Sequence, residues 1–293
     1  MANVTVTTAA VFIPEMWRDA ILNYAERRFR LKGQVTDLSS EVSNGVKRGD
    51  TIHTPRITEE TAVSKTAGQN VVFTANTDGE TNLVVDQHFY SAKLIEDVVR
   101  VQESAALFNG YTRAMGYAMA KKIENFLAVN MLQAATANDT ALATDNTMTA
   151  AELRSGIKKL YDIGVDTTAP SSEVFLYAGP ATYLSILGLD QFVSWQKIGP
   201  VEPSGNKTGM LGNVYGIPTF QSTDWDEGGT TGDEVVTIFT KEAVYYAEQL
   251  LRVQSDYSID ALGTKVVADA LFGGVLAQTA GTTAGQIVNF TNP

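Results

Sequence analysis

The sequence predicts an α+β protein built around one long helix, and three patterns support this fold class. Apolar residues recur at three- and four-residue steps from Ile95 to about Thr136, which is the period of a helix with one buried face. Two strand-like segments enclose a polar stretch within residues 51–91, and helices alternate with strands between residues 142 and 245. Separate helical and strand blocks beside a smaller alternating unit are consistent with an α+β protein.

The N-terminal segment is predicted to be an arm followed by a helix. Residues 1–14 are rich in Thr, Val and Ala, and they are expected to be extended. Pro14 favours a helix start because proline fits the first helical turn, and the residues 15–31 that follow place apolar side chains on one face. We expect residues 1–48 to pack on a neighbouring element or on a neighbouring subunit.

Residues 49–91 are predicted to form an extended hairpin with flanking strands. Residues 51–57 favour a strand that Pro55 confines to a sheet edge or a bulge, and residues 83–90 favour a second strand. Residues 58–82 are rich in Thr, Asn and Gly and contain too few apolar residues to build a core. An isolated hairpin is only marginally stable in water, so we expect something outside the subunit to hold it.

A spine helix is expected within residues 92–141. No proline interrupts the 95–136 segment, which would span roughly 60 Å at the helical rise. Asn109–Gly110 is the expected place for a bend, because glycine inside a helix costs about 1 kcal/mol relative to alanine. The residues predicted to face the core are Leu94, Val98, Val101, Ala105, Phe108, Met115, Met119, Ile123 and Phe126.

The second half of the chain is predicted to hold a compact α/β unit over residues 142–245 and returning strands with a tail over residues 246–293. The first helix of this unit should begin near Thr149, bury a face that includes Tyr161, and end at Gly164. The further elements expected are a central strand at 173–178, a helix at 181–188, strands at 217–220, 235–240 and 251–260, a strand or short helix at 243–249, and an apolar segment at 265–278 that breaks at Gly273–Gly274.

Composition narrows the classes of function. Hydrophobic residues make up 44% of the 293-residue chain and charged residues 19%, which is ordinary for a folded protein. Cysteine is absent, which excludes disulfides and cysteine metal sites, and the net charge of −11 disfavours general nucleic-acid binding. Residues 1–48 are an exception with seven Lys/Arg against five Asp/Glu; a solvated helix face is favoured there over contact with an acidic partner. We see no signal peptide and no run of about 18 apolar residues, so we expect synthesis in a cytoplasm without export.

The motif search predicts no catalytic residue, no cofactor-binding residue and no metal site. His53 and His88 lie in the two predicted strands of the hairpin, and each is expected to be an exposed strand histidine. They would be near one another if the two strands pair with these residues side by side. No P-loop or dinucleotide-binding glycine motif occurs. The weaker candidates, interpreted as chance matches or solvated positions, are the Ser-x-x-Lys pairs Ser155/Lys158, Ser194/Lys197 and Ser204/Lys207, the acidic loop with Asp224, Asp226, Glu227 and Asp233, and the Asn-x-Ser/Thr positions Asn3, Asn138, Asn206 and Asn289.

The order of these elements resembles the major capsid proteins of tailed bacteriophages, which have the Hong Kong 97-type fold. A basic N-terminal helix, a polar hairpin, a long spine and an α/β domain with a returning strand follow one another as in that family. The phrases that carry the resemblance are Gly49–Ile57, Val85–Tyr90, Ile95–Asp97, Gln102–Ser104, Val174–Pro180 with Leu184 and Phe192, Gly212–Pro218 with Ser222, Leu271–Val275, and Ile287–Val288 as the closing peripheral strand.

This resemblance implies a structural subunit that self-assembles into an icosahedral shell of pentamers and hexamers around double-stranded phage DNA. The hairpin would lie over the adjacent subunit, and the unit at 142–245 would be the axial domain that meets its copies at the ring axis. Scaffolding and portal proteins are the implied partners, DNA would be enclosed without specific binding, and no membrane or enzymatic activity is implied. The implied location is the virion, after assembly in the bacterial host cytoplasm. Lys65 is a candidate for a covalent cross-link by position alone, and a non-covalent shell is favoured.

Two other interpretations remain open on the sequence. An encapsulin-like cellular compartment would share the fold and enclose protein cargo in place of DNA. An extracellular binding or adhesion protein would explain the Thr-, Asn- and Gly-rich strands, but it would need an export signal. An enzyme would need a catalytic cluster that the motifs do not supply.

Overall fold

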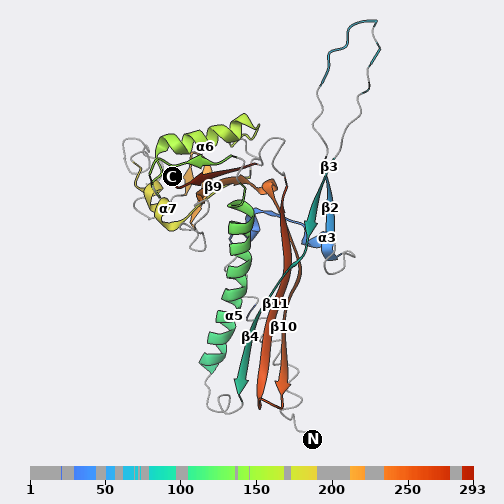
Figure 1. Cartoon of the computed structure of the whole chain (residues 1–293), viewed down its shortest axis with the longest axis vertical. Helices are drawn as coiled ribbons and strands as arrows, with labels where there is room; N and C mark the ends of the chain where they lie inside the picture. Colours follow the sequence, from blue (N-terminus) through green and yellow to red (C-terminus); the bar gives the residue numbers. More distant parts are fainter. Residues whose placement is uncertain are drawn as a thin grey trace.

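The computed structural model describes residues 21, 30–43, 51–56, 62–68, 70, 71, 73, 79–96, 105–135, 138–144, 146–167, 173–189, 212–221, 234–277 and 286–293. Figure 1 shows a long sheet with a helix beside it, a smaller lobe at one end, and a hairpin that projects from the body. The elements are η1 (Lys32–Gln34), β1 (Thr36–Asp37), α3 (Ser39–Ser43), β2 (Thr51–Arg56), β3 (Gly79–Val84), β4 (Gln87–Glu96), α5 (Ala105–Asn125), η2 (Phe126–Leu132), β5 (Thr140–Ala141), α6 (Ala150–Asp162), β6 (Val174–Ala178), α7 (Pro180–Leu187), β7 (Asn213–Val214), β8 (Ile217–Gln221), β9 (Glu234–Thr240), η3 (Lys241–Ala243), β10 (Val244–Ser258), β11 (Gly263–Leu276) and β12 (Ile287–Thr291).

The long sheet has the order β1-β10-β11-β4 and packs one face on the spine. β10, β11 and β4 pair antiparallel over most of their length, and the short β1 joins the edge of β10 in parallel. Met115, Met119 and Ile123 of α5 are buried in the same core cluster as Phe272 of β11. The helical period predicted for these three residues is therefore confirmed.

The spine differs from the sequence prediction at both ends. Residues 87–96 form β4, so Ile95 lies in a strand that pairs with β11 and does not begin the helix. α5 continues without interruption through Asn109–Gly110, where a bend was expected. The irregularity lies instead at η2, a π-helical segment with a bond from the Gln133 N–H to the Ala128 carbonyl oxygen at 2.8 Å. The spine ends at this segment, before Thr136, which lies outside the described residues.

The smaller lobe is a six-stranded sheet in the order β5-β12-β9-β6-β8-β7, with two helices on one face. Alternate residues of β6 face opposite sides: Leu176 belongs to the core cluster under α6 and α7, whereas Tyr177 belongs to the cluster shared with the spine. The central position predicted for the 173–178 strand is confirmed, because β6 pairs with β8 on one side and β9 on the other.

Local signals set the bounds of α6. Thr149 and Glu152 form a capping box, in which each side chain accepts a hydrogen bond from the other residue's backbone N–H. Gly164 has a φ of +86°, the left-handed conformation that ends helices. Leu153 and Leu160 are buried as predicted, but Tyr161 is 47% exposed and does not belong to the core face.

The last strand was assigned to the wrong sheet. Ile287 and Val288 were expected to close the long sheet, but β12 lies in the six-stranded sheet between β9 and β5. Asn289 of this strand is fully buried, so its Asn-x-Ser/Thr position is inaccessible in the folded chain.

One further expectation is corrected. Gly273–Gly274 does not break β11, which runs continuously from Gly263 to Leu276. The short elements β1 and α3 follow η1, and between them the Leu38 N–H donates to the Tyr246 carbonyl oxygen at 2.7 Å. The predicted helix at 15–31 falls largely outside the described residues: Ile21 is helical and buried, whereas Arg30 and Leu31 lie in a bend that precedes η1. Among the helices that the structure describes, none combines the length and the apolar character needed to cross a membrane.

Candidate assembly surfaces

The structure separates the two histidines that the sequence placed on one hairpin. His53 lies in β2, where its Nδ1 is 3.3 Å from the Glu80 carboxylate on β3. His88 lies in β4 of the long sheet, with Nε2 3.3 Å from the Asp269 carboxylate on β11. The expectation that they share a strand pair is wrong, because the chain leaves one sheet for the other between β3 and β4.

The remaining candidates for chemistry do not form a site in the part of the chain that the structure describes. Ser155 and Lys158 are both exposed on α6, and the Lys158 ammonium is paired with Asp162 at 2.5 Å. Asn138 is half-buried, and its Nδ2 donates to the Ile287 carbonyl oxygen at 3.1 Å. No group of three or more metal-ligating side chains occurs among the described residues. The candidates that lie outside the described residues are Ser194, Lys197, Ser204, Lys207, Asp224, Asp226, Glu227, Asp233, Asn3 and Asn206.

The hairpin carries apolar side chains that its own subunit does not cover. β2 and β3 pair along Thr51–Arg56 and Gly79–Val84, and this two-stranded base leads into a loop that projects away from the body (Figure 1). Every described residue of 62–73 is exposed, including Val63 at 87% and Phe73 at 92%. A side chain of this size gains nothing from folding unless another surface covers it.

The base of the hairpin, by contrast, is anchored. Ile52, Leu83 and Val85 form a small buried cluster with Leu271 of β11 on the face of the long sheet that points away from the spine. The Thr81 hydroxyl donates to the Ala277 carbonyl oxygen at 3.2 Å. Pro55 is exposed in β2, at the sheet edge that its missing N–H predicted.

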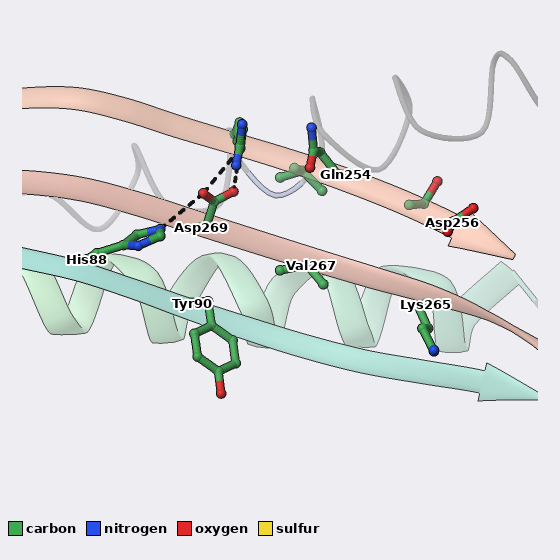
Figure 2. A pocket seen from close by; sticks show the side chains of 10 residues that line it. His88, Tyr90, Gln254, Asp256, Lys265, Val267 and Asp269 are labelled. Carbon is green, nitrogen blue, oxygen red and sulfur yellow. Dashed lines mark hydrogen bonds and ion pairs between the residues drawn. The ribbon is translucent and has the colours of Figure 1, made fainter. Parts of the chain in front are cut away.

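Beyond this base, the same outer face of the long sheet holds a groove of about 660 Å³ (Figure 2). At one end, Asp269 is nearly buried and accepts a hydrogen bond from Arg252 Nε at 2.9 Å, with His88 on its other side. Tyr90 of β4 is 74% exposed and stands opposite Asp269 in the strand register, and Val267 lies two residues further along β11 towards Lys265. Aromatic and apolar side chains among charged groups are typical of a protein–protein contact. The residues that line the groove come from β4, β10 and β11 and are His88, Tyr90, Arg252, Val253, Gln254, Ser255, Asp256, Lys265, Val267 and Asp269.

A third surface is the turn that joins β10 to β11 at the far end of the long sheet. Ile259 is 78% exposed and Leu262 is 64% exposed. Leu262 also has a φ of +43°, a left-handed conformation that is unfavourable for a branched residue. Two large apolar side chains at an exposed tip, one of them on a strained backbone, are consistent with a contact surface.

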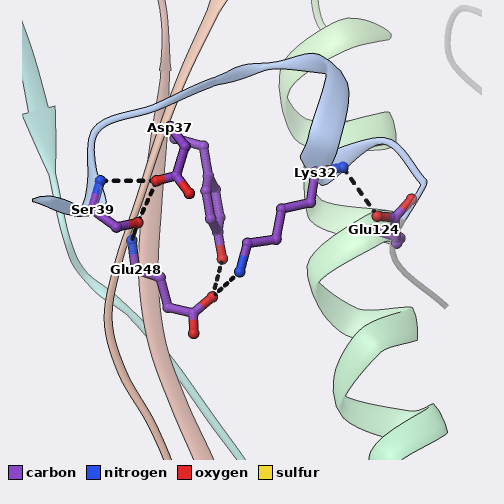
Figure 3. A network of polar contacts seen from close by, with 6 residues as sticks. Lys32, Asp37, Ser39, Glu124 and Glu248 are labelled. Atoms are coloured by element: carbon purple, nitrogen blue, oxygen red, sulfur yellow. Dashed lines mark hydrogen bonds and ion pairs between the residues drawn. The ribbon is translucent and has the colours of Figure 1, made fainter. Parts of the chain in front are cut away.

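A polar strap fixes the point where the N-terminal segment joins the body (Figure 3). Glu124 of α5 is 7% exposed, and its carboxylate accepts hydrogen bonds from the backbone N–H groups of Arg30, Leu31 and Lys32 at 2.9–3.1 Å. The Lys32 ammonium then reaches Glu248 of β10 at 2.6 Å. Hydrogen bonds to a buried carboxylate are stronger than neutral ones, so this strap ties the segment to both the spine and the sheet.

The two tyrosines nearest the strap are strongly perturbed. Burial raises the pKa of the Tyr246 hydroxyl above its usual range, and the neighbouring Glu248 carboxylate raises it further. Burial likewise raises the pKa of Tyr177, with the Glu124 carboxylate as the next cause. Burial therefore disfavours the ionised form of both hydroxyls.

A buried amide joins the spine to the smaller lobe. The Asn289 side chain of β12 donates to the carbonyl oxygens of Leu132 at 2.9 Å and Ala135 at 2.7 Å, and it accepts from the Thr237 hydroxyl of β9. These carbonyl groups lie at the end of the spine, where the helix no longer continues to supply N–H donors, although the Leu132 oxygen also accepts from the Ala135 N–H at 3.3 Å. Asn289 thus satisfies the end of the spine from a strand more than 150 positions away in the sequence. No sequence motif marks this contact.

Comparison with known proteins gives a consistent structural result. No family model matches the chain, and no curated protein matches it. A structure from Mycobacterium phage Che8 matches with a TM-score of 0.67 and 21% identity, covering 87% of this chain and 88% of that one. The mature capsid of bacteriophage PhiM1 matches with a TM-score of 0.68 and 12% identity over 90% and 86% of the two chains. A virus-like particle from Pyrococcus furiosus matches with a TM-score of 0.57 and 12% identity over 94% and 98%. The chain therefore has the fold of these capsid structures, and the Hong Kong 97-type fold predicted from the sequence is confirmed.

Proposed function

We propose that this chain is the major capsid protein of a tailed bacteriophage, a structural subunit that closes with its copies into an icosahedral shell around double-stranded DNA. One observation carries the proposal: a capsid-type fold extends over 87–90% of the chain, and it presents a hairpin whose apolar side chains Val63, Val71 and Phe73 the subunit itself leaves uncovered. A lone subunit gains nothing from such a hairpin, whereas a shell covers it in every copy.

The hairpin and the outer groove are the first pair of surfaces in this proposal. The described part of 62–73 exposes Val63, Val71 and Phe73 and carries a single charge, on Lys65. The groove offers the exposed Tyr90 ring and Val267 among charged side chains. The hairpin of one copy lies over the groove of the next, so that the apolar side chains of the hairpin cover Tyr90 and Val267. Such a contact is heterologous and continues around a ring until rotation closes it.

The other surfaces follow from the two ends of the subunit. Residues 142–245 act as the axial domain and meet their copies at the ring axis, in pentamers and hexamers. The Ile259–Leu262 tip, at the far end of the long sheet from the smaller lobe, lies between rings. The net charge of −11 suits a shell that encloses DNA without binding it specifically. Scaffolding and portal proteins assist assembly in the host cytoplasm, and the mature protein resides in the virion.

This function needs no catalytic site. The free energy of assembly comes from interfaces repeated in every copy, and the ion pairs of the described residues join elements within the subunit. We therefore propose a structural protein and no enzymatic activity.

A second candidate is a cellular compartment that encloses protein. The match to the Pyrococcus furiosus virus-like particle favours it, although the TM-score of 0.57 is lower than the 0.67–0.68 of the phage structures. The two functions share the subunit fold and differ in the cargo. Nuclease-protected DNA inside particles purified from infected cells supports the capsid, and a protein cargo without DNA supports the compartment.

The test is a deletion of residues 62–73, with the ends joined by a short Gly-Ser linker. The described residues of this segment make no contact with the core, so the variant should fold and keep the far-ultraviolet circular dichroism of the parent. It should form no closed shells in sedimentation and electron microscopy. A matched control replaces exposed Ala67 with Ser and should assemble normally. Normal shells from the deletion variant would show that the hairpin does not join subunits.

A further inference from the structure

β11 carries two adjacent glycines at the level where the hairpin base crosses it. The pairing of β4 with β11 ends at Phe272, which faces Gln87. Gly273 and Gly274 lie just beyond, paired only with Ala247 and Tyr246 of β10 among the described strands. Among the described strands, this part of β11 is therefore hydrogen-bonded on one edge only. Because successive residues of a strand point to opposite faces of the sheet, Gly273 and Gly274 face opposite sides.

Gly273 admits the backbone of the hairpin base on the outer face. A Cβ at this position would lie 2.1 Å from the Val84 carbonyl oxygen and 2.9 Å from Val85 Cα. Real Cβ atoms essentially never lie within 3.0 Å of another heavy atom, so the two backbones would have to move apart to accept even a methyl group. The backbone at the end of β3 thus contacts the backbone of β11 directly, with no side chain between them.

Gly274 admits the end of the spine on the inner face. A Cβ here would lie 3.0 Å from Phe126 Cε1 and 3.3 Å from Met131 Sδ. Both residues belong to η2, the π-helical segment that ends the spine, and Phe126 also packs edge-on against Phe272 with ring centroids 5.2 Å apart. A π-helical turn carries one extra residue per turn and is frequent at functional positions.

We propose that Gly273–Gly274 is a coupling point through which the spine and the hairpin set each other's position. η2 contacts one face of β11 and β3 contacts the other face one residue away, so a displacement of the spine end moves the β11 backbone and with it the base of the hairpin. Because the interior is close-packed, a displacement of one element at such a contact also displaces the element packed against it. The consequence for assembly rests on the proposed function, since the direction of the hairpin decides whether it reaches the next copy.

The chain has no cysteine, so spin labels can be placed at chosen positions and distances measured by double electron–electron resonance. One pair, Asn82→Cys with Lys265→Cys, reports the hairpin base relative to the long sheet. The other, Ala118→Cys with Lys265→Cys, reports the spine relative to the same sheet. All three positions are exposed. The labelled chain is measured as dispersed subunits, diluted with an excess of unlabelled protein.

Each glycine is then substituted, and the distance to the element on the opposite face of β11 is measured. Gly273→Ala, whose added Cβ lies nearest to the hairpin base, should shift the spine distance as well as the hairpin distance, the latter by about 1 Å, since the 2.1 Å contact has to open to 3.0–3.4 Å. Gly274→Val, which contacts only the spine side, should shift the hairpin distance. Adding Phe126→Leu to Gly274→Val removes the ring atom that the new side chain meets and should return the hairpin distance to its parental value.

Gly79→Ala is the matched control, because this glycine lies in β3 with nothing within 4 Å of an added Cβ, and it should move neither distance. Shifts confined to the side that each substitution contacts would overturn the coupling. If Gly273→Ala does not fold, Gly274→Val and its rescue decide the question. A chain whose labels behave as expected but which never forms shells would refute the proposed function and leave the coupling intact.

Discussion

Asn289→Ala tests how the spine is joined to the smaller lobe. The substitution removes three hydrogen bonds, to the Leu132 and Ala135 carbonyl oxygens and from the Thr237 hydroxyl, at a fully buried position. At roughly 0.5–1.5 kcal/mol for each of the three hydrogen bonds removed, the free energy of unfolding should fall by about 3 kcal/mol.

The assay is urea unfolding of dispersed subunits, followed by circular dichroism. A loss of about 3 kcal/mol lowers the midpoint by about 1 M or more at the slopes usual for chains of this size. Asn138→Ala is the matched control, because Asn138 is half-buried and its side-chain amide donates to the carbonyl oxygen of Ile287, in the same strand, at 3.1 Å. It should cost about 1 kcal/mol.

Asn289→Asp sharpens the same test through pH. It keeps the oxygen that accepts from Thr237 but places a carboxylate against the Leu132 and Ala135 carbonyl oxygens. Repulsion and burial disfavour the charged form, so the pKa of the introduced carboxyl is higher in the folded state than in the unfolded state. The variant should therefore be less stable than Asn289→Ala at neutral pH and recover relative to it as pH falls. If Asn289→Ala loses no more stability than Asn138→Ala, the amide does not join the lobes as described.

Three further outcomes are expected. Thr149→Ala removes the capping box of α6 and should cost about 1 kcal/mol in urea unfolding, whereas Arg154→Ala, on the exposed side of the same helix, should change stability little; equal effects would contradict the role of the cap. Gly110→Ala should stabilise the subunit by up to about 1 kcal/mol in thermal unfolding, because alanine is the better helix former and an added Cβ inside α5 meets nothing within 4 Å. A loss of stability would mean that the glycine has a conformational role. Because burial raises the pKa of Tyr177 and Tyr246 in the folded state, their stabilising contribution is complete below the unfolded-state pKa of about 10 and is lost as pH rises above it. Tyrosinate absorbance should show these two groups ionising only on unfolding, and Tyr246→Phe should make the alkaline loss of stability less steep; ionisation of every tyrosine before unfolding would contradict the burial described.

The elements that sequence reasoning predicted correctly are those with local causes. Thr149 and Glu152 specify the start of α6 within four residues, and Gly164 specifies its end.

The errors have long-range causes. Ile95 fits the helical period of the sequence, but it lies in a strand because it pairs with Thr264 on β11. A break was predicted at Gly273 and Gly274 because glycine weakens a strand. In the structure these glycines instead leave space for β3 on one face of β11 and for η2 on the other. β12 pairs with strands about 50 and 150 residues earlier in the chain, which no local pattern reveals.

The candidate surfaces divide in the same way. The uncovered hairpin could be predicted, because a long polar segment with few apolar residues cannot build a core. The outer groove could not, because β4, β10 and β11 bring together residues from two distant parts of the chain. Glu124 carries no motif either; only the folded chain places its carboxylate beneath three consecutive N–H groups.

The most direct test of the shell-forming function is sedimentation followed by electron microscopy of the full chain, produced in bacteria alone and together with a scaffolding protein from the same phage. The proposal predicts uniform particles far larger than a single subunit, with closed icosahedral shells in at least one of the two preparations. A stable monomer in both preparations would contradict the proposal that this chain builds a capsid.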